Sequence, residues 1–299
     1  MSINKVFAID LNFFGFPGAI ASYLVRLPRQ VVLIEPGPAS TIPALQKALQ
    51  EFDLELSDIS DVFITHIHLD HAGAVGWLAE QGATIHVHPK GASHLINPEK
   101  LIQSAGRIYG DLMDTLWGEF KSVAEKNLHI PQDNEIITID GYAFQLLDTP
   151  GHSDHHYAIL FEGMLFSGDI GGIRIGNTPH IELPTPPPEF NPPKWRANLK
   201  RLQELKLQAI APTHFGIYRD VEYHLSQLLE KLDQLEEWLE KVMQSDPSVE
   251  ALSDALGQWL DLQGRRHLPQ IYQPYFAYLN PTWMSAAGIF RYWHKVRQA

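Results

Sequence analysis

Four metal-type ligands lie within six residues, at the point where a predicted strand gives way to a predicted helix. The segment reads HIHLDH at residues 66–71 and follows the short apolar strand predicted at residues 61–65. Two histidines spaced two apart on an extended segment point to the same side. One metal ion rarely takes so many ligands from a single loop, so the pattern predicts a sheet edge that holds two ions. The alternative is a histidine-rich surface loop.

The same pattern of a short apolar strand followed by a ligand-type side chain recurs three more times. His152, Asp169 and His214 each follow such a strand after a small or turn residue. Open sheets collect their sites at the carboxyl ends of their strands, so we expect all four segments to meet at one edge. Each turn is common when taken alone. The specific signal is their joint occurrence in this order.

Residues 1–218 alternate predicted strands and helices. This rhythm predicts an α/β layered architecture, in which helices cover a sheet. A mostly helical insert at about residues 92–126 interrupts it. We expect strands at residues 6–9, 21–25, 31–34, 61–65, 84–88, 135–139, 142–147, 157–161, 164–166 and 208–212, and helices at residues 41–52, 72–81 and 194–206.

Residues 219–299 are predicted to form an all-helical C-terminal region. Apolar residues repeat at spacings of three and four over residues 221–242, and further helices are expected at 248–262 and 281–296. The stripe is typical of a helix that docks on its own domain, and a coiled coil that forms a homodimer is the alternative.

Composition narrows the chemistry. The chain has 299 residues with 15 histidines and no cysteine, which excludes disulfides, iron–sulfur clusters and cysteine nucleophiles. The net charge of −12 argues against a nucleic-acid partner. No apolar run is long enough to span a membrane, and Asp10 and Asn12 interrupt the apolar N-terminal stretch. We therefore expect a cytoplasmic protein without a membrane partner.

The ordered motifs HIHLDH, GH, SGD and TH resemble those of the metallo-β-lactamase-fold superfamily, and within it the glyoxalase II-like hydrolases. The resemblance covers residues 1 to about 218, including LIEPG at residues 33–37. It implies a four-layer αββα sandwich (metallo-β-lactamase fold) with a helical C-terminal appendage. It also implies two divalent metal ions at one sheet edge, with zinc expected first and iron or manganese as alternatives.

The resemblance also assigns the ligands of both ions. The first ion takes three histidines, the second takes two histidines and a carboxylate, and one carboxylate bridges them: His66, His68 and His152; Asp70, His71 and His214; and Asp169. Flavodiiron oxidoreductases of this fold usually have a carboxylate where His68 stands, so His68 argues against that branch.

Other residues are expected to support this centre. Asp70 is the predicted catalytic residue, because a carboxylate beside a metal-bridging hydroxide can orient it by accepting its proton. A metal-bound histidine usually donates a hydrogen bond from its other ring nitrogen to a neighbouring acceptor. His156 fills the second histidine of the family pattern GHxxxH and is expected to support a ligand, as are Thr65 and Asp154.

The substrate pocket is expected beside the centre. Tyr109 and Trp117 of the insert are candidates for a lid over a partly apolar pocket, and plain packing is the alternative. The proline-rich residues 179–193 are expected to form a wall, or else a connection between domains. Arg174 is a candidate contact for an anionic substrate, as are Arg107 and Lys90, although such residues are usually solvated.

These features predict a hydrolase of a small-molecule substrate, in which a metal-bridging hydroxide attacks an ester, thioester or lactone-type carbonyl. The alternative within the fold is a mononuclear iron oxidoreductase, similar to persulfide dioxygenases, that would use His66, His152 and Asp169. A non-enzymatic binding protein is a third possibility. The pair His86 and His88 also has the two-residue spacing, but no Asp-His follows it, and we predict a structural role.

Overall fold

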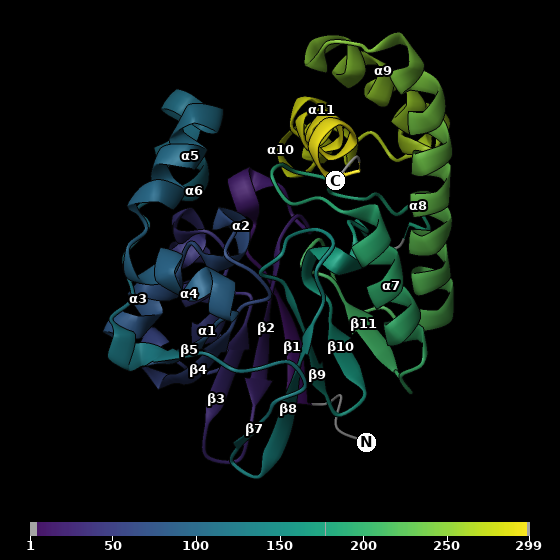
Figure 1. The fold of residues 1–299 in the computed structure, drawn as a ribbon. Coiled ribbons are helices and arrows are strands. Elements are labelled where there is room, and N and C mark those ends of the chain that lie inside the picture. Colours follow the sequence, from purple (N-terminus) through teal and green to yellow (C-terminus); the bar gives the residue numbers. More distant parts are fainter. Residues whose placement is uncertain (1–4, 177, 298–299) are drawn as a thin grey trace.

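Two β-sheets face each other at the centre of the molecule, and helices cover their outer faces (Figure 1). The structure, a computed structural model, describes residues 5–176 and 178–297. The first sheet has the strand order β1-β2-β3-β4-β5-β6, and the second has the order β11-β10-β9-β8-β7. The strands are β1 (Val6–Asp10), β2 (Ala21–Arg26), β3 (Val31–Ile34), β4 (Ile59–Phe63), β5 (Thr84–His86), β6 (Leu128–His129), β7 (Ile136–Ile139), β8 (Tyr142–Asp148), β9 (Tyr157–Phe161), β10 (Met164–Phe166) and β11 (Ala209–Ala211).

Strand direction places several carboxyl ends at one edge. In the first sheet β3, β4, β5 and β6 run parallel, and in the second sheet β10 and β11 run parallel. The remaining neighbours pair antiparallel. Parallel neighbours end on the same side, so the segments that leave β3, β4, β10 and β11 begin close together.

Both faces of each sheet are buried, and β2 shows why its sequence is a continuous apolar run. Tyr23 and Val25 join the cluster between the two sheets, whereas Leu24 joins the cluster beneath the helices of the first sheet. Side chains of a strand alternate between faces, so a strand covered on both sides has few polar positions. The four-layer sandwich that the sequence predicts is thereby confirmed.

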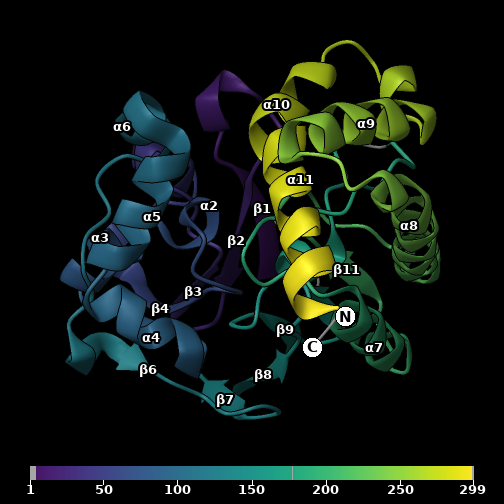
Figure 2. The ribbon, with the colours of Figure 1, turned by 45° about the horizontal axis from the view of Figure 1, so that its top comes forward.

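The helices divide into a layer on each sheet and a group beyond them (Figures 1 and 2). The first six helices lie over the first sheet, α7 and α8 lie over the second, and the last three gather at the end of the molecule where the insert also rises. They are α1 (Ile42–Gln50), α2 (Leu69–Ala72), α3 (Val75–Glu80), α4 (Pro89–Ile96), α5 (Glu99–Tyr109), α6 (Met113–Trp117), α7 (Pro192–Gln203), α8 (Val221–Val242), α9 (Val249–Leu262), α10 (Phe276–Leu279) and α11 (Thr282–Arg291). None of the helices in these ranges combines the length and the apolar character that a membrane span requires.

The leucine stripe of α8 packs within its own chain. Leu228, Leu232 and Leu235 are buried in the same cluster as Trp195 of α7 and Leu165 of β10. The stripe therefore docks the helix on the second sheet and on its neighbouring helices, as the heptad spacing favours.

Two predicted helices are divided in the structure. The helix expected at residues 72–81 begins earlier, at Leu69, and is interrupted before Val75, because the Ala74 N–H donates to the carbonyl oxygen of Gly37. The helix expected at residues 281–296 ends as α11 at Arg291 and continues as a π-helical turn over Tyr292–Val296.

Candidate metal centre

Seven ligand-type side chains from both sheets meet where the strands end. The HIHLDH segment leaves β4, and its last residues begin α2, so residues 66–71 turn sharply at the sheet edge. From the second sheet, His152 follows β8, Asp169 follows β10 and His214 follows β11. The structure thus brings together all the ligand candidates of the sequence.

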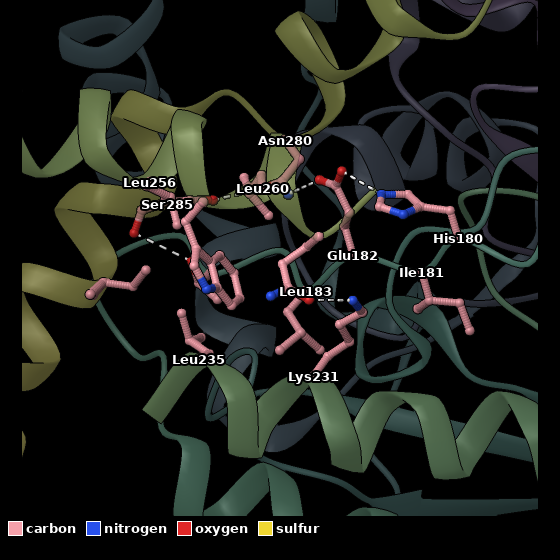
Figure 3. A pocket seen from close by; sticks show the side chains of 14 residues that line it. His180, Ile181, Glu182, Leu183, Lys231, Leu235, Leu256, Leu260, Asn280 and Ser285 are labelled. Atoms are coloured by element: carbon pink, nitrogen blue, oxygen red, sulfur yellow. Dashed lines mark hydrogen bonds and ion pairs between the residues drawn. The ribbon is translucent and has the colours of Figure 1, made fainter. Parts of the chain in front are cut away.

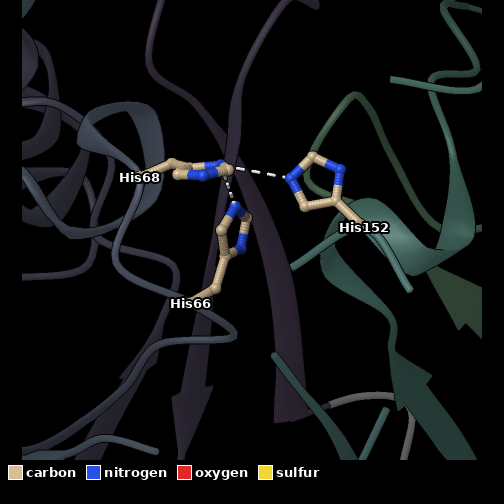
Figure 4. Close-up of side chains that lie close together, drawn as sticks. All are labelled: His66, His68 and His152. Atoms are coloured by element: carbon tan, nitrogen blue, oxygen red, sulfur yellow. Dashed lines mark hydrogen bonds between the residues drawn. The ribbon is translucent and has the colours of Figure 1, made fainter. Parts of the chain in front are cut away.

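The first group is a triad of imidazoles. Figure 4 shows the rings of His66, His68 and His152 converging. Nε2 of His66 lies 2.8 Å from Nδ1 of His68, and Nε2 of His152 lies 3.1 Å from the same atom. These three residues each offer one nitrogen atom within 4.8 Å of the others, which is a spacing that one metal ion can occupy.

The second group joins two imidazoles with a carboxylate. Oδ2 of Asp70 lies 3.5 Å from Nε2 of His71 and 3.5 Å from Nε2 of His214. His71 and His214 are buried, whereas the Asp70 side chain is 20% exposed. Asp70 is therefore the member of this group that an incoming molecule can reach.

Asp169 stands between the two groups. Its Oδ2 lies 3.3 Å from Nε2 of His152 in the first group, and its Oδ1 lies 3.4 Å from Nε2 of His71 and 3.5 Å from Nε2 of His214 in the second. One oxygen thus faces each group. Ligand atoms around a tetrahedral ion with bonds of about 2.0–2.2 Å are separated by similar distances.

Two atoms at this junction test whether the residues fit a metal. Nε2 of His71 and Oδ1 of Asp169 are buried and have no hydrogen-bond partner. A buried polar atom without a partner is costly, and bound metal ions are one of the few ways to satisfy it. The donor set and these two atoms fit divalent metal ions.

The Nδ1 atoms of His66, His152 and His214 are each held by a fixed polar partner. Nδ1 of His152 contacts the carbonyl oxygen of Pro184 at 3.0 Å, and Nδ1 of His214 contacts that of Ala19 at 3.0 Å. Nδ1 of His66 lies 3.0 Å from the Thr65 hydroxyl, as expected for a supporting residue. These contacts leave Nε2 of the three rings free to bind a metal, whereas His68 presents its Nδ1 to the first group.

Glu35 is the supporting residue that the sequence reasoning missed. It lies at the end of β3, is 1% exposed and contacts Nδ1 of His71. Its carboxylate also accepts from the Thr65 N–H at 2.6 Å and from the Thr213 hydroxyl at 2.8 Å. The signal was present, since Glu35 follows an apolar strand just as the ligands do.

His156 supports the loop that carries Asp169. Nδ1 of His156 lies 2.8 Å from the Thr149 hydroxyl, and its Nε2 lies 3.5 Å from the Ile170 N–H. The ring is fully buried and is not part of either ligand group. It therefore lies where the sequence placed it, behind the ligands.

Burial and charge divide the site into two electrostatic halves. Burial lowers the pKa of His68 to about 3, and it also lowers the pKa of His66 and His152, so these imidazoles are neutral. Burial opposes charge on His71 as well, but the nearby carboxylates, Asp70 foremost, raise its pKa well above the usual value. A place that stabilises positive charge despite burial is suited to a cation.

An open cavity of roughly 610 Å³ leads to the centre. Tyr109 and Trp117 of the insert line it, as do prolines between residues 184 and 188 and side chains of α10 and α11. The insert and the proline-rich segment therefore both form walls, and the C-terminal helices close the opposite side. Its volume and mixed lining are typical of small-molecule sites.

A buried polar chain fixes the C-terminal wall in place (Figure 3). The Glu182 carboxylate accepts from Arg265 Nε at 2.8 Å and from Asn280 Nδ2 at 3.0 Å, while the Ser285 hydroxyl donates to Asn280 Oδ1 at 2.7 Å. Burial opposes ionisation of Glu182, but Arg265 and His180 lower its pKa to about 2. Asn280 and Ser285 also line the main cavity, so the chain links its wall to the core.

Two expected site residues lie elsewhere. Asp154, expected to support a ligand, instead pairs with Lys194 at 2.6 Å near the surface. Arg174, expected at the substrate pocket, does not line the cavity, because the Asp220 carboxylate binds its guanidinium at 2.8 and 2.9 Å and the ring of Tyr218 stacks against it. Both expectations were wrong because the spacing of residues along the chain does not reveal an ion-pair partner.

Known proteins share this fold and sequence pattern. The chain is 28% identical over 222 residues to the metallo-β-lactamase fold-containing protein ST1585 of Sulfurisphaera tokodaii, a match that spans 72% of this chain and 81% of that protein. It is 24% identical over 252 residues to a hydroxyacylglutathione hydrolase of Ectopseudomonas mendocina, spanning 81% and 73% of the two chains. The crystal structure of the metallo-β-lactamase family protein TTHA1429 from Thermus thermophilus superimposes with a TM-score of 0.66 at 20% identity, over 97% of this chain and 93% of that one.

The family assignment rests on the same residues that build the site. The sequence profile of the metallo-β-lactamase superfamily matches residues 15–214, a range that begins between β1 and β2 and ends at the last ligand candidate, His214. The chain therefore belongs to the metallo-β-lactamase superfamily of metal-dependent hydrolases.

Proposed function

We propose that the protein is a dinuclear metal-dependent hydrolase that cleaves a small-molecule ester, thioester or lactone. The observation that carries this proposal is Asp169, whose two carboxylate oxygens face different ligand groups. The first ion would be held by His66, His68 and His152, and the second by Asp70, His71 and His214. A complete second group argues against a mononuclear site.

A bound pair of divalent ions supplies a nucleophilic water of lowered pKa and polarises the carbonyl under attack. The chain itself supplies the orientation. Burial opposes the ionisation of Asp70, but His71 and His214 hold its pKa well below the usual range. Its carboxylate is therefore ionised at neutral pH and faces the cavity, where it can accept a proton from the attacking water.

The walls favour a carbonyl substrate over a nucleic acid. Much of the lining is aromatic, aliphatic or proline, and the chain carries a net charge of −12. A polyanionic backbone calls for a broad basic face. The similarity to a hydroxyacylglutathione hydrolase gives further support for a carbonyl substrate, and zinc is the first metal to test, before iron or manganese.

Elemental analysis followed by a substrate panel tests the proposal. Two metal ions per chain and turnover of esters, thioesters or lactones are the expected results. A single iron per chain, with no hydrolysis by the iron-loaded protein, would instead favour the mononuclear oxidoreductase. Two ions with no hydrolysis of any panel member would count against the hydrolase and favour a binding role.

A further inference from the structure

Helix α5 presents two different stripes to the cavity. Leu101, Ala105 and Tyr109 recur every fourth residue, line the cavity and are at least partly buried. Lys100 and Arg107 stand two turns apart on the neighbouring face, line the same cavity and are exposed. Because residues at such spacings share a helix face, the apolar stripe lies deeper and the basic stripe lies at the mouth.

The two basic residues of this stripe, Lys100 and Arg107, form no ion pair within the part of the chain that the structure describes. Neither Lys100 nor Arg107 has a carboxylate within 4.0 Å among residues 5–176 and 178–297. Lys90 of α4 lines the same wall and lies 4.0 Å from Asp154, at the limit of an ion pair. Three cationic side chains thus gather on one wall of the cavity, two of them unpaired.

The acidic groups around the cavity do not neutralise this wall. Within the described lining, Glu189 is the one carboxylate besides the ligand candidates Asp70 and Asp169. It accepts from the Asp154 N–H at 2.8 Å and lies 3.6 Å from Nε2 of His155. In a chain with 35 acidic and 23 basic residues, an uncompensated basic wall at the mouth is a local exception.

Further large side chains line the cavity next to the apolar stripe of α5. Tyr109 packs edge-on against Trp117 with ring centroids 5.0 Å apart, and among the described residues its hydroxyl has only the Met284 sulfur, at 3.8 Å, as a partner. Tyr278 of α10 lines the same space. This deeper part suits a hydrocarbon portion of the substrate.

We propose that the substrate is an amphipathic anion: its apolar part lies between α5 and α11, and its anionic group meets Lys100 and Arg107 at the mouth. This inference rests on the proposed function, because it names the substrate class of the same site. It assigns the insert a role in selecting the substrate, in addition to packing on the core.

The test compares matched, non-hydrolysable thioethers by titration calorimetry on the metal-loaded protein. One probe is S-octyl-3-mercaptopropionate, and its neutral partner is the corresponding amide. A third probe, 2-(octylthio)ethyl phosphate, separates a preference for carboxylate from a preference for phosphate. We expect the better of the two anions to bind about tenfold tighter than the amide, since exposed charge pairs each contribute modestly, and we expect added salt to weaken this preference.

Charge reversal locates the preference. In the double variant Lys100→Glu/Arg107→Glu, the ratio of the affinities for the anion and for the neutral amide should fall close to one. The control Lys47→Glu/Lys126→Glu changes the net charge equally at exposed positions outside the cavity lining and should retain the preference. An unchanged preference in the first variant would mean that the metals bind the anion, and no preference in the wild type would mean that no anion is selected. Either result overturns the inference.

Turnover of the octanoyl thioesters of 3-mercaptopropionate and its amide is measured separately. If neither these thioesters nor any member of the ester, thioester and lactone panel is cleaved, while the charge-reversal variant still abolishes the binding preference, the hydrolase proposal fails and the anion site stands. If both thioesters are cleaved, and if for each of them kcat/KM is the same in the wild type and in Lys100→Glu/Arg107→Glu, the hydrolase proposal stands and the anion site fails.

Discussion

Two His-x-His pairs follow neighbouring parallel strands, and they have different surroundings. His66 and His68 follow β4, and the nitrogens that they present meet those of His152 from the other sheet. His86 and His88 lie at the end of β5, one strand away. The spacing in the sequence is the same for both pairs.

In the second pair, the ring nitrogens contact separate partners and do not converge on one point. His86 lies between Asp61, at 2.8 Å, and His129, at 3.0 Å, so its two nitrogens point in opposite directions. Nδ1 of His88 accepts from the Lys90 N–H at 3.1 Å and thereby caps α4. The second pair belongs to none of the ligand groups found in the described residues, although Asp61 and His129 lie beside His86.

The comparison shows what spacing leaves undetermined. A spacing of two residues on a strand places two imidazoles on the same side of it. A metal site needs further donors from other parts of the chain. The first pair meets the ends of β8, β10 and β11, which the packing of the two sheets brings to it. The predictions below set matched variants of the two regions against each other.

The largest expected difference is in turnover. Asp70→Asn and His71→Ala should each lower kcat/KM for an ester or thioester by about 10²–10⁴-fold, because each loses a metal ligand and Asp70 also orients the attacking water. His86→Gln should leave kcat/KM unaltered within error. Equal losses at the two sites, with all three variants folded by circular dichroism, would contradict the assignment.

The buried carboxylates behind the two regions form a second matched pair. Glu35 holds His71, and Asp61 holds His86. Glu35→Gln should weaken metal binding by about 10–100-fold, because it replaces the carboxylate that orients a ligand candidate by an amide, which is a weaker acceptor. Asp61→Asn should leave metal affinity unchanged, as measured by competition with a coloured chelator. A similar loss of metal affinity in both variants would show that any buried carboxylate near the sheet edge supports metal binding, whether or not it contacts a ligand candidate.

Removal of metal should destabilise the first region selectively. Ligands that bind only the folded state raise its stability, so chelation should lower the Tm of the wild type by about 10 °C. His86→Gln should show the same shift, and Asp169→Asn should show a clearly smaller one. Differential scanning calorimetry with and without chelator makes the measurement, and an undiminished shift in Asp169→Asn would argue against its shared position.

The smallest expected effect is the pH dependence that His86 contributes. Burial lowers the pKa of His86 below its usual value near 6.5, so in the unfolded chain this side chain takes up a proton at a higher pH than in the folded protein. Its contribution to stability is complete above about pH 6.5 and is lost as the pH falls, at no more than about 1.4 kcal/mol per pH unit. Urea unfolding at pH 7 and pH 5.5 should show that the free energy of unfolding falls less in His86→Gln than in the wild type. Equal decreases in the two proteins would refute the buried neutral state of His86.

Several features were accessible from local pattern. The apolar runs located the strands, because a strand buried on both faces leaves few polar positions. The recurrence of a ligand-type residue after several strands located the seven candidate ligands that the structure brings together, since carboxyl ends of strands collect at one edge. The same rule would have found Glu35, which ends β3 in the same way.

Features that depend on a distant partner were not accessible in this way. Arg174 is bound by Asp220, and Asp154 is bound by Lys194, which withdraws both from the site. The break between α2 and α3 depends on Gly37, whose carbonyl oxygen accepts from the Ala74 N–H. In each case a contact across the tertiary structure overrides what the local residues favour.

The sequence by itself therefore determined the fold class, the candidate ligands and their donor chemistry of nitrogen and oxygen, because periodicity and residue type act locally. Only the tertiary structure decided which of two identical histidine spacings meets further ligands, which residues hold the ligands in place and which walls enclose the cavity. The physical reason is that a site of this kind is a convergence of separate segments, and the packing of the two sheets sets their relative positions.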